Sequence, residues 1–106
     1  MNTENYFPVS VTPEIIIETV ARYHGLKPDE LKERTRKRVI TEARHVAMSF
    51  ICRIGVTETD TGEMLGGFDH SSVNTSKRKV SNLYDVDRQF REKMDAIEKE
   101  LRHEAD

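Results

Sequence analysis

A pair of glycines that leads directly into a helix is the feature that most restricts the fold of this chain. Gly66 and Gly67 permit a tight backbone turn and a close approach to a neighbouring surface. Asp69 follows, and its carboxylate can accept hydrogen bonds from the free amides at a helix start. Residues 70–84 then continue with helical periodicity through three apolar positions: Val73, Val80 and Leu83. The pattern predicts the turn and the second helix of a helix-turn-helix unit.

The first turns of that helix carry short polar side chains, and cations follow them. At helical spacing, His70, Ser71 and Asn74 lie near one face at the amino-terminal end. Three consecutive cations, residues 77–79, come within three turns and can meet phosphates. This order of reading groups and cations is typical of a recognition helix for DNA.

The remaining segments also have helical patterns. Thr12 and Pro13 combine a hydroxyl cap with a proline at the first helical position, and this helix ends at Gly25. A short helix begins at Pro28, and residues 39–54 form a long central one whose apolar stripe comprises Val39, Ile40, Ala43, Val46, Ala47, Phe50, Ile51 and Ile54. A last helix over residues 86–103 has its own stripe: Phe90, Met94, Ile97 and Leu101. We expect Met48, Met64 and Met94 in the core.

The first helix of the helix-turn-helix pair, residues 57–65, is the weakest element. Asp60 stands three residues after Thr57, as in a capping box. Gly62 lowers helix propensity, so we expect Met64 and Leu65 to anchor the segment. The whole pattern predicts an all-α fold of about six helices. Residues 1–11 form a loose arm that packs through Tyr6 and Phe7, and residues 12–106 form a single helix-turn-helix domain.

The charge is unusual for a DNA-binding chain, because the formal net charge of the 106 residues is −2. It is, however, segregated along the sequence. Residues 32–44 hold six cations and two anions, whereas residues 85–106 hold eight acids and five bases. Such segregation is what a one-faced DNA binder requires, although charged helix faces are also ordinary protein surface.

Several classes of function are disfavoured. One cysteine, Cys52, allows no intramolecular disulfide, and four histidines without paired spacing predict no metal site. Asp69, His70 and Ser71 are no catalytic triad, because adjacent helix residues diverge by about 100°. We expect no enzyme, no cofactor, no bound nucleotide and no membrane span, and a cytoplasmic address.

The octet from Gly66 to Val73 closely resembles the signature Gly-Gly-Arg-Asp-His-Thr-Thr-Val of the carboxy-terminal, DNA-binding domain of the bacterial replication initiator DnaA. The resemblance continues upstream through residues 17–23, 31–38 and 44–48, in the order that the family uses, and covers about Pro13 to Leu101. It implies a stand-alone helix-turn-helix domain with a Trp-repressor-like fold. The phosphate loop of the initiator's ATPase does not occur in the sequence, so nucleotide switching is not expected.

The resemblance also implies how DNA is held. The helix-turn-helix would enter the major groove, with Asp69, His70 and Ser71 at base edges, while Arg36 would enter the adjacent minor groove. The backbone phosphates would be contacted by hydroxyls and cations. We expect these residues to be Arg34, Arg38, Arg44, Ser72, Thr75, Lys77 and Lys79.

Four departures from the family pattern alter this expectation. Phe68 replaces the arginine of the signature, and Glu42 stands where the family often has a basic residue. Both weaken phosphate binding. Each lost phosphate contact reduces the slope of log affinity against log salt concentration by roughly 0.9. Ser71 and Ser72 replace threonines, and the methyl lost at Ser71 could have touched a thymine methyl. Base preference is therefore expected to be relaxed.

The competing interpretation is a protein-interaction module that kept the fold but lost DNA binding. The acidic balance, the altered signature and the weak segment 57–65 support it. A continuous positive face joining Arg36, Arg44, Lys77 and Lys79 would favour DNA, whereas interruption by Glu42 and Asp69 would favour a protein partner.

Overall fold

The computed structural model describes residues 7–103, and within them the chain is helical with no strand. Its elements are α1 (Pro13–Tyr23), the 3-10 helix η2 (Pro28–Lys32), α2 (Arg38–Arg53), α3 (Glu58–Met64), α4 (His70–Val86) and α5 (Arg88–Arg102). The predicted all-α fold is confirmed. The six predicted helical segments are all present, the second as a short 3-10 helix.

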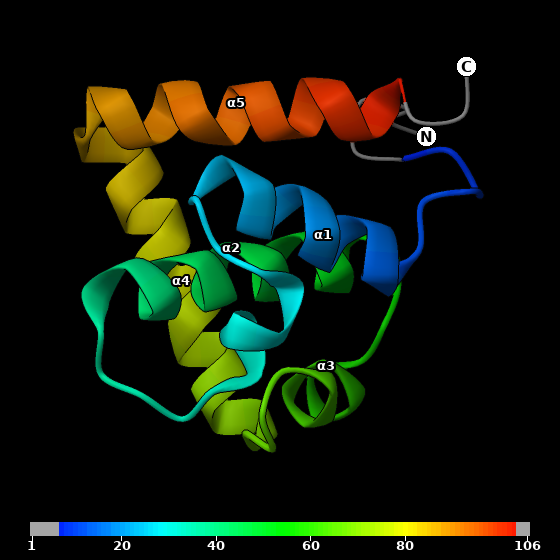
Figure 1. The fold of residues 1–106 in the computed structure, drawn as a ribbon, viewed down its shortest axis with the longest axis vertical. Coiled ribbons are helices and arrows are strands. Elements are labelled where there is room, and N and C mark those ends of the chain that lie inside the picture. Colours follow the sequence, from blue (N-terminus) through cyan, green and yellow to red (C-terminus); the bar gives the residue numbers. More distant parts are fainter. Residues whose placement is uncertain (1–6, 104–106) are drawn as a thin grey trace.

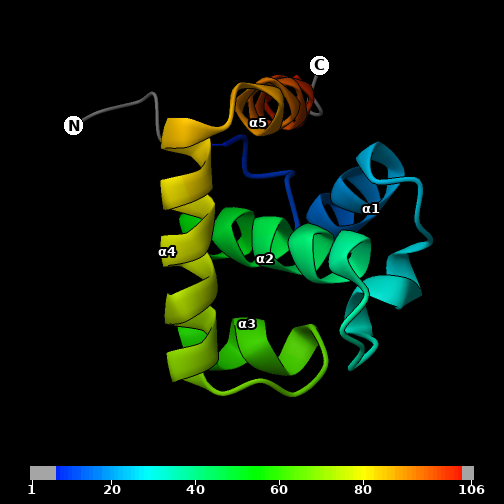
Figure 2. The same cartoon turned by 90° about the vertical axis from the view of Figure 1, so that its left-hand side faces the viewer.

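The helices pack around α2, which contacts α1, η2, α3 and α4. Figure 2 shows α4 upright along one edge, with α5, α2 and α3 meeting it at successive heights. In Figure 1, α1 lies between α5 and α2, and it contacts both. The buried core includes Val46, Ala47, Phe50 and Ile51, at most 1% exposed, so α2 is the central helix that its apolar stripe predicted.

Side chains cap the starts of four helices, as the sequence indicated for three of them. Asp87 ends α4 and also caps α5, because its Oδ1 accepts a hydrogen bond from the amide of Phe90 at 3.0 Å. Helix α4 therefore runs to Val86, two residues beyond its predicted end at Tyr84. The other caps are Thr12, Thr57 and Asp69.

Two apolar residues that the sequence analysis placed in the core are exposed. Val39 is 45% exposed, because it lies in the first turn of α2 beside the exposed residues 36–38. Met64 is 38% exposed and does not anchor α3. That role falls to Thr61 and Leu65, both fully buried, which are four residues apart and so share one helix face. Thr61 Oγ1 also accepts a hydrogen bond from Cys52 Sγ at 3.6 Å.

Part of the amino-terminal segment is packed on the domain. The ring of Phe7 meets that of Phe50 edge-on with centroids 5.9 Å apart, and Val11 is 5% exposed. Tyr6, the other residue expected to pack, lies outside the described residues. Phe7 thus packs on the domain, as the sequence analysis expected for this residue, and Val11 belongs to the buried core as well.

Candidate nucleic-acid interface

The turn between α3 and α4 depends on three glycines. Gly66 and Gly67 have φ of +115° and +82°, the left-handed region that favours glycine. Gly62 in α3 accepts hydrogen bonds on its carbonyl from the amides of Gly67 at 3.0 Å and Phe68 at 2.9 Å. A Cβ at Gly62 would lie 1.9 Å from the carbonyl oxygen of Phe68. The glycine that lowers helix propensity is therefore the residue that lets the turn close onto α3.

The amino-terminal end of α4 is fixed by its cap. Asp69 Oδ1 accepts a hydrogen bond from the amide of Ser72 at 2.8 Å. This backbone hydrogen bond, helped by the Ser72 hydroxyl, lowers the pKa of the Asp69 carboxyl. His70 and Ser71 are exposed in the first turn. The three residues predicted to face base edges thus lie together at one exposed helix end.

A hollow of about 370 Å³ lies between this helix end and α2. We call it the α2-side hollow, and it is lined by Arg44, His45, Met48, Phe68, Asp69, Ser71, Ser72, Thr75, Ser76 and Lys79. Six of the predicted DNA-contacting residues line it. Hydroxyls of α4 and the cations Arg44 and Lys79 share this concave surface, which suits an anionic backbone, with the Asp69 carboxylate at the helix start.

The basic segment between η2 and α2 is tied to the helix-turn-helix turn. Arg34 Nη1 donates to the carbonyl oxygens of Gly66 at 3.0 Å and Gly67 at 2.9 Å. Arg44 is 5% exposed, and its Nη1 donates to the carbonyl of Glu33 at 2.6 Å. Burial lowers the pKa of Arg44, and the nearby charge of Arg34 lowers it further. These two predicted phosphate ligands are therefore already engaged within the protein.

Arg36 and Arg38 differ from those two arginines, because both are exposed. Arg36 lies in the loop just before α2, and Arg38 is the first residue of that helix. Arg38 also lines a smaller hollow of about 180 Å³ that shares His45 and Lys79 with the α2-side hollow. Positive side chains therefore extend from the loop along α2 to the middle of α4.

His45 is a residue of this surface that the sequence analysis missed. Burial, then the charges of Lys79 and Arg44, lower its pKa, while Glu42 acts in the opposite direction. The signal available in the sequence was its place next to Arg44 in the basic segment, one residue along the same helix.

Glu42, which the sequence suggested would interrupt the positive face, is paired with other elements. Its Oε2 lies 3.0 Å from His24 Nε2 and 3.3 Å from Lys93 Nζ. His24 comes after α1 and Lys93 belongs to α5. Lys93 therefore partly neutralises the carboxylate, while Glu42 also lines the smaller hollow together with Arg38, His45 and Lys79.

The other flank of α4 is acidic. α3 contains Glu58, Asp60 and Glu63 and no cation. Lys77 Nζ, predicted to contact phosphate, lies 3.3 Å from Glu58 Oε1. This hydrogen bond and ion pair add to a backbone hydrogen bond in lowering the pKa of Glu58. Lys77 thus faces α3, not the α2-side hollow.

Between α3 and the start of α4 lies a second hollow, of about 390 Å³. We call it the α3-side hollow, and it is lined by Thr59, Glu63, Gly67, Phe68, Asp69 and His70. His70 therefore shares this hollow with two carboxylates, Asp69 at the cap of α4 and Glu63 on α3. Phe68 and Asp69 line both hollows.

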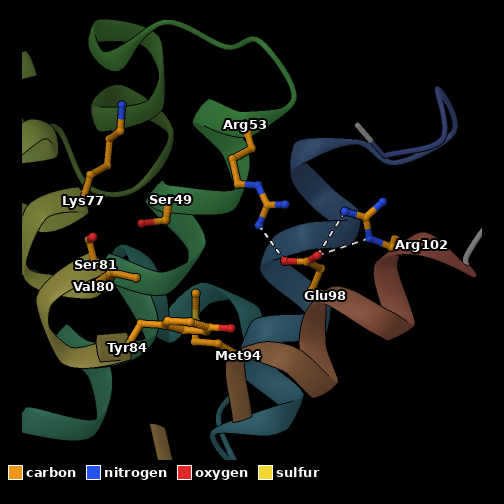
Figure 3. A pocket seen from close by; sticks show the side chains of 9 residues that line it. All are labelled: Ser49, Arg53, Lys77, Val80, Ser81, Tyr84, Met94, Glu98 and Arg102. Atoms are coloured by element: carbon orange, nitrogen blue, oxygen red, sulfur yellow. Dashed lines mark hydrogen bonds and ion pairs between the residues drawn. The ribbon is translucent and has the colours of Figure 1, made fainter. Parts of the chain in front are cut away.

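A further hollow, of about 710 Å³, is formed by residues of α2, α4 and α5. Figure 3 shows Glu98 between Arg53 and Arg102, with an ion pair to each. The apolar side chains of Val80 and Met94 lie beside the Tyr84 ring. None of the predicted base-contacting residues lines this hollow, although Lys77 does.

Residues 7–103 contain no group of three or more histidine, cysteine or acidic residues able to hold a metal ion. In the same residues no helix is long and apolar enough to span a membrane.

Comparison with known proteins connects this chain to one family. The family described as "Bacterial dnaA protein helix-turn-helix" matches residues 13–80. The chromosomal replication initiator protein DnaA of Roseiflexus castenholzii is 34% identical over 100 residues, which cover 90% of this chain and 20% of that protein. The proteins of the same name from Flavobacterium psychrophilum and Geobacter sulfurreducens are also 34% identical, each over 86% of this chain. The chain spans about a fifth of the length of these relatives.

Proposed function

Because this chain belongs to the bacterial DnaA helix-turn-helix family, we propose that it binds double-stranded DNA by sequence, with α4 in the major groove and the loop before α2 in the adjacent minor groove. The observation that carries the proposal is the α2-side hollow, where Ser72, Thr75 and Lys79 face Arg44 and His45 across a concave surface. Hydroxyls and cations arranged in this way fix the register of a DNA backbone without reading its sequence.

Base readout is assigned to the exposed start of α4. Asp69 can accept from a cytosine amino group, and the imidazole N–H of His70 can donate to a base acceptor. Ser71 adds a hydroxyl able to donate or accept. Arg36, exposed in the loop, is attracted to the negative potential of a narrow A·T-rich minor groove.

The phosphate contacts are assigned unequally. Arg38 and Lys79 are exposed and Ser72 and Thr75 line the α2-side hollow, so these four residues approach phosphates directly. Arg34 and Arg44 are already bound to backbone carbonyls, and we assign them a share through their charge on the positive surface. Lys77 contributes only if it leaves Glu58.

The names of the relatives give the biological setting that we propose. A domain of this family that reads initiator-type sites would act in chromosomal replication or in the regulation of replication or transcription, by occupying those sites. The chemistry is binding alone, without a catalytic step.

Fluorescence anisotropy of labelled duplexes tests the proposal. One duplex carries an initiator-type box and the other the same bases scrambled, at about 50 and 200 mM salt, with the wild type, His70→Ala and Asn82→Ala. Asn82 is exposed near the far end of α4, away from both hollows, so Asn82→Ala is the matched control. We expect the wild type and the control to prefer the box and His70→Ala to lose that preference.

Two other outcomes have distinct meanings. Equal binding to both duplexes, abolished at the higher salt, would overturn sequence readout and leave electrostatic binding. No binding at either salt would overturn the proposal and favour the protein-interaction interpretation.

A further inference from the structure

The ring of Phe68 joins three segments of the protein. Phe68 is half-buried in the turn before α4. The guanidinium carbon of Arg34, from the basic loop, lies 4.4 Å from the centroid of its ring. That of Arg44, from α2, lies 4.7 Å from the same centroid. Both distances are within the range of a cation–π contact.

Hydrogen bonds to backbone carbonyls also hold both arginines of this cluster. Arg34 donates to the carbonyls of Gly66 and Gly67, just before Phe68 in the turn. Arg44 donates to the carbonyl of Glu33, just before Arg34 in the loop. The loop is thus held at two consecutive residues, by α2 and by the turn. Arg36 is two residues further along, in the same short loop.

Two guanidinium groups on one ring would otherwise repel each other. The ring presents its negative face to cations, and the three carbonyl oxygens offset part of the remaining charge. An aliphatic side chain of similar size could fill the same space, but it would make no cation–π contact with either guanidinium group. The aromatic character of residue 68 is therefore what the cluster requires.

We propose that Phe68 is a positioning residue for DNA binding: by holding Arg34 and Arg44 on its ring, it fixes the basic loop against the recognition helix, so that Arg36 and His70 reach adjacent grooves in one register. The inference rests on the proposed function. It also accounts for the loss of the signature arginine at position 68, because the fixed placement of Arg34 and Arg44 compensates for the cation that Phe68 lacks.

Phe68 is a poor anchor for a partner protein or a deoxyribose. Its Cε2 atom is close enough to Gly66 that a Cβ there would come within 3.1 Å of it. The turn lies on one side of the ring and two guanidinium groups lie on it, so the open part of its surface is the part that lines the two hollows.

The test that needs no DNA measures how ordered the loop is. We would record the heteronuclear ¹H–¹⁵N NOE of the Thr35 and Arg36 amides in the wild type, Phe68→Leu and Phe68→Tyr. Phe68→Tyr retains the ring and is the conservative control. We expect Phe68→Leu to lower both NOE values and Phe68→Tyr to leave them unchanged. Unchanged values in Phe68→Leu would overturn the proposal, whether or not the wild type binds DNA.

The second test asks whether Phe68 acts through Arg36. We expect Phe68→Leu to weaken binding to the box duplex about fivefold to tenfold, and Phe68→Tyr to stay within about twofold. In an Arg36→Ala background, Phe68→Leu should reduce the affinity for the box duplex much less, because the loop then has no arginine to place in the minor groove. Equal losses in both backgrounds would overturn the proposal.

Arg34→Gln covers the case in which Phe68→Leu does not fold. Arg34 is exposed, so its replacement opens the cluster without creating a core cavity. We expect lowered NOE values at Thr35 and Arg36 in a protein with wild-type helical circular dichroism. NOE values that stay at the wild-type level would contradict the proposal that the Arg34–Phe68–Arg44 cluster holds the loop. A wild type that binds no duplex, with the loop ordered through Phe68, would overturn the proposed function alone.

Discussion

The two hollows beside the start of α4 are similar in size and opposite in charge. The α2-side hollow, of about 370 Å³, is lined by Arg44, His45 and Lys79. The α3-side hollow, of about 390 Å³, is lined by Glu63 and His70, and Asp69 lines both. A chain with a net charge of −2 can thus present a positive surface on one flank of a helix. For the proposed function, the difference predicts that DNA is held from the α2 side, with little phosphate binding on the α3 side.

The geometry of the α3 side depends most on Gly62, so the largest effect is expected there. A Cβ at Gly62 would lie 1.9 Å from the Phe68 carbonyl oxygen, which is backbone and cannot swing away. We expect Gly62→Ala to lower the free energy of unfolding by about 1–3 kcal/mol, despite the higher helix propensity of alanine. Thermal unfolding by circular dichroism would then show a fall of roughly 5–20 °C.

Thr59→Ala is the matched control for this change. Thr59 is exposed on the same short helix, and its replacement should shift the midpoint by no more than a few degrees. If Gly62→Ala unfolds at the same temperature as the wild type, α3 and the turn can move apart at little cost in free energy. That result would contradict the importance of the close contact.

Gly62 also illustrates what could be predicted from the sequence. Helix starts, the glycine turn and the central position of α2 follow from local signals, namely caps at Thr12, Thr57 and Asp69 and an apolar stripe. The role of Gly62 does not, because helix propensity is a local property and the contact with Phe68 is made only when the turn folds back. The sequence therefore indicated a weak helix where the structure has a close contact.

The candidate site was predictable in the same uneven way. The signature placed Asp69, Ser71 and Ser72 correctly at one helix end, since they are neighbours in sequence. The Arg34–Phe68–Arg44 cluster joins Phe68 to residues that stand 34 and 24 positions before it in the sequence, and no local pattern predicts such contacts. The pairing of Glu42 with His24 and Lys93 is likewise a product of packing.

On the α2 side, Arg36→Ala should have the largest effect on binding. Arg36 is exposed and is assigned to the minor groove, so its loss removes a cation from the DNA. We expect about tenfold weaker binding to the box duplex and a log–log salt slope reduced by about 0.9. Anisotropy titrations at several salt concentrations measure both.

Arg88→Ala serves as the control, because Arg88 is an exposed arginine at the start of α5 that pairs with Glu92. The same formal charge is removed from the chain, so equal losses for the two variants would show that only total charge matters. That result would contradict a one-sided grip.

On the α3 side, removing a negative charge should strengthen binding. Glu63 lines the α3-side hollow beside His70, where it repels nearby phosphates. We expect Glu63→Gln to raise affinity about twofold at low salt, with the gain vanishing at high salt as screening increases. Glu92→Gln on α5 is the control, and an equal gain there would argue against any local effect.

The smallest expected effect is the pH dependence that His45 gives to the α2 side. Burial, Lys79 and Arg44 lower its pKa in the folded protein from the ordinary value of 6.5, against a smaller opposing influence of Glu42. Arg38 lines the same surface and adds positive charge. The folded state therefore binds fewer protons at His45 than the unfolded state, so the stability that this difference contributes is complete above the ordinary pKa of about 6.5 and is lost as the pH falls below it through the lowered pKa of the folded state.

Urea unfolding at pH 5.5 and 7.5 tests this, with His45→Gln as the comparison. Since other titrating groups act equally in both proteins, the difference between their pH dependences isolates His45. We expect the wild-type midpoint to fall on acidification by roughly 0.2 M more than that of His45→Gln. Parallel pH dependences would mean that His45 gains a proton without repulsion, and the α2 side would then be less positive than its arginines and lysine indicate.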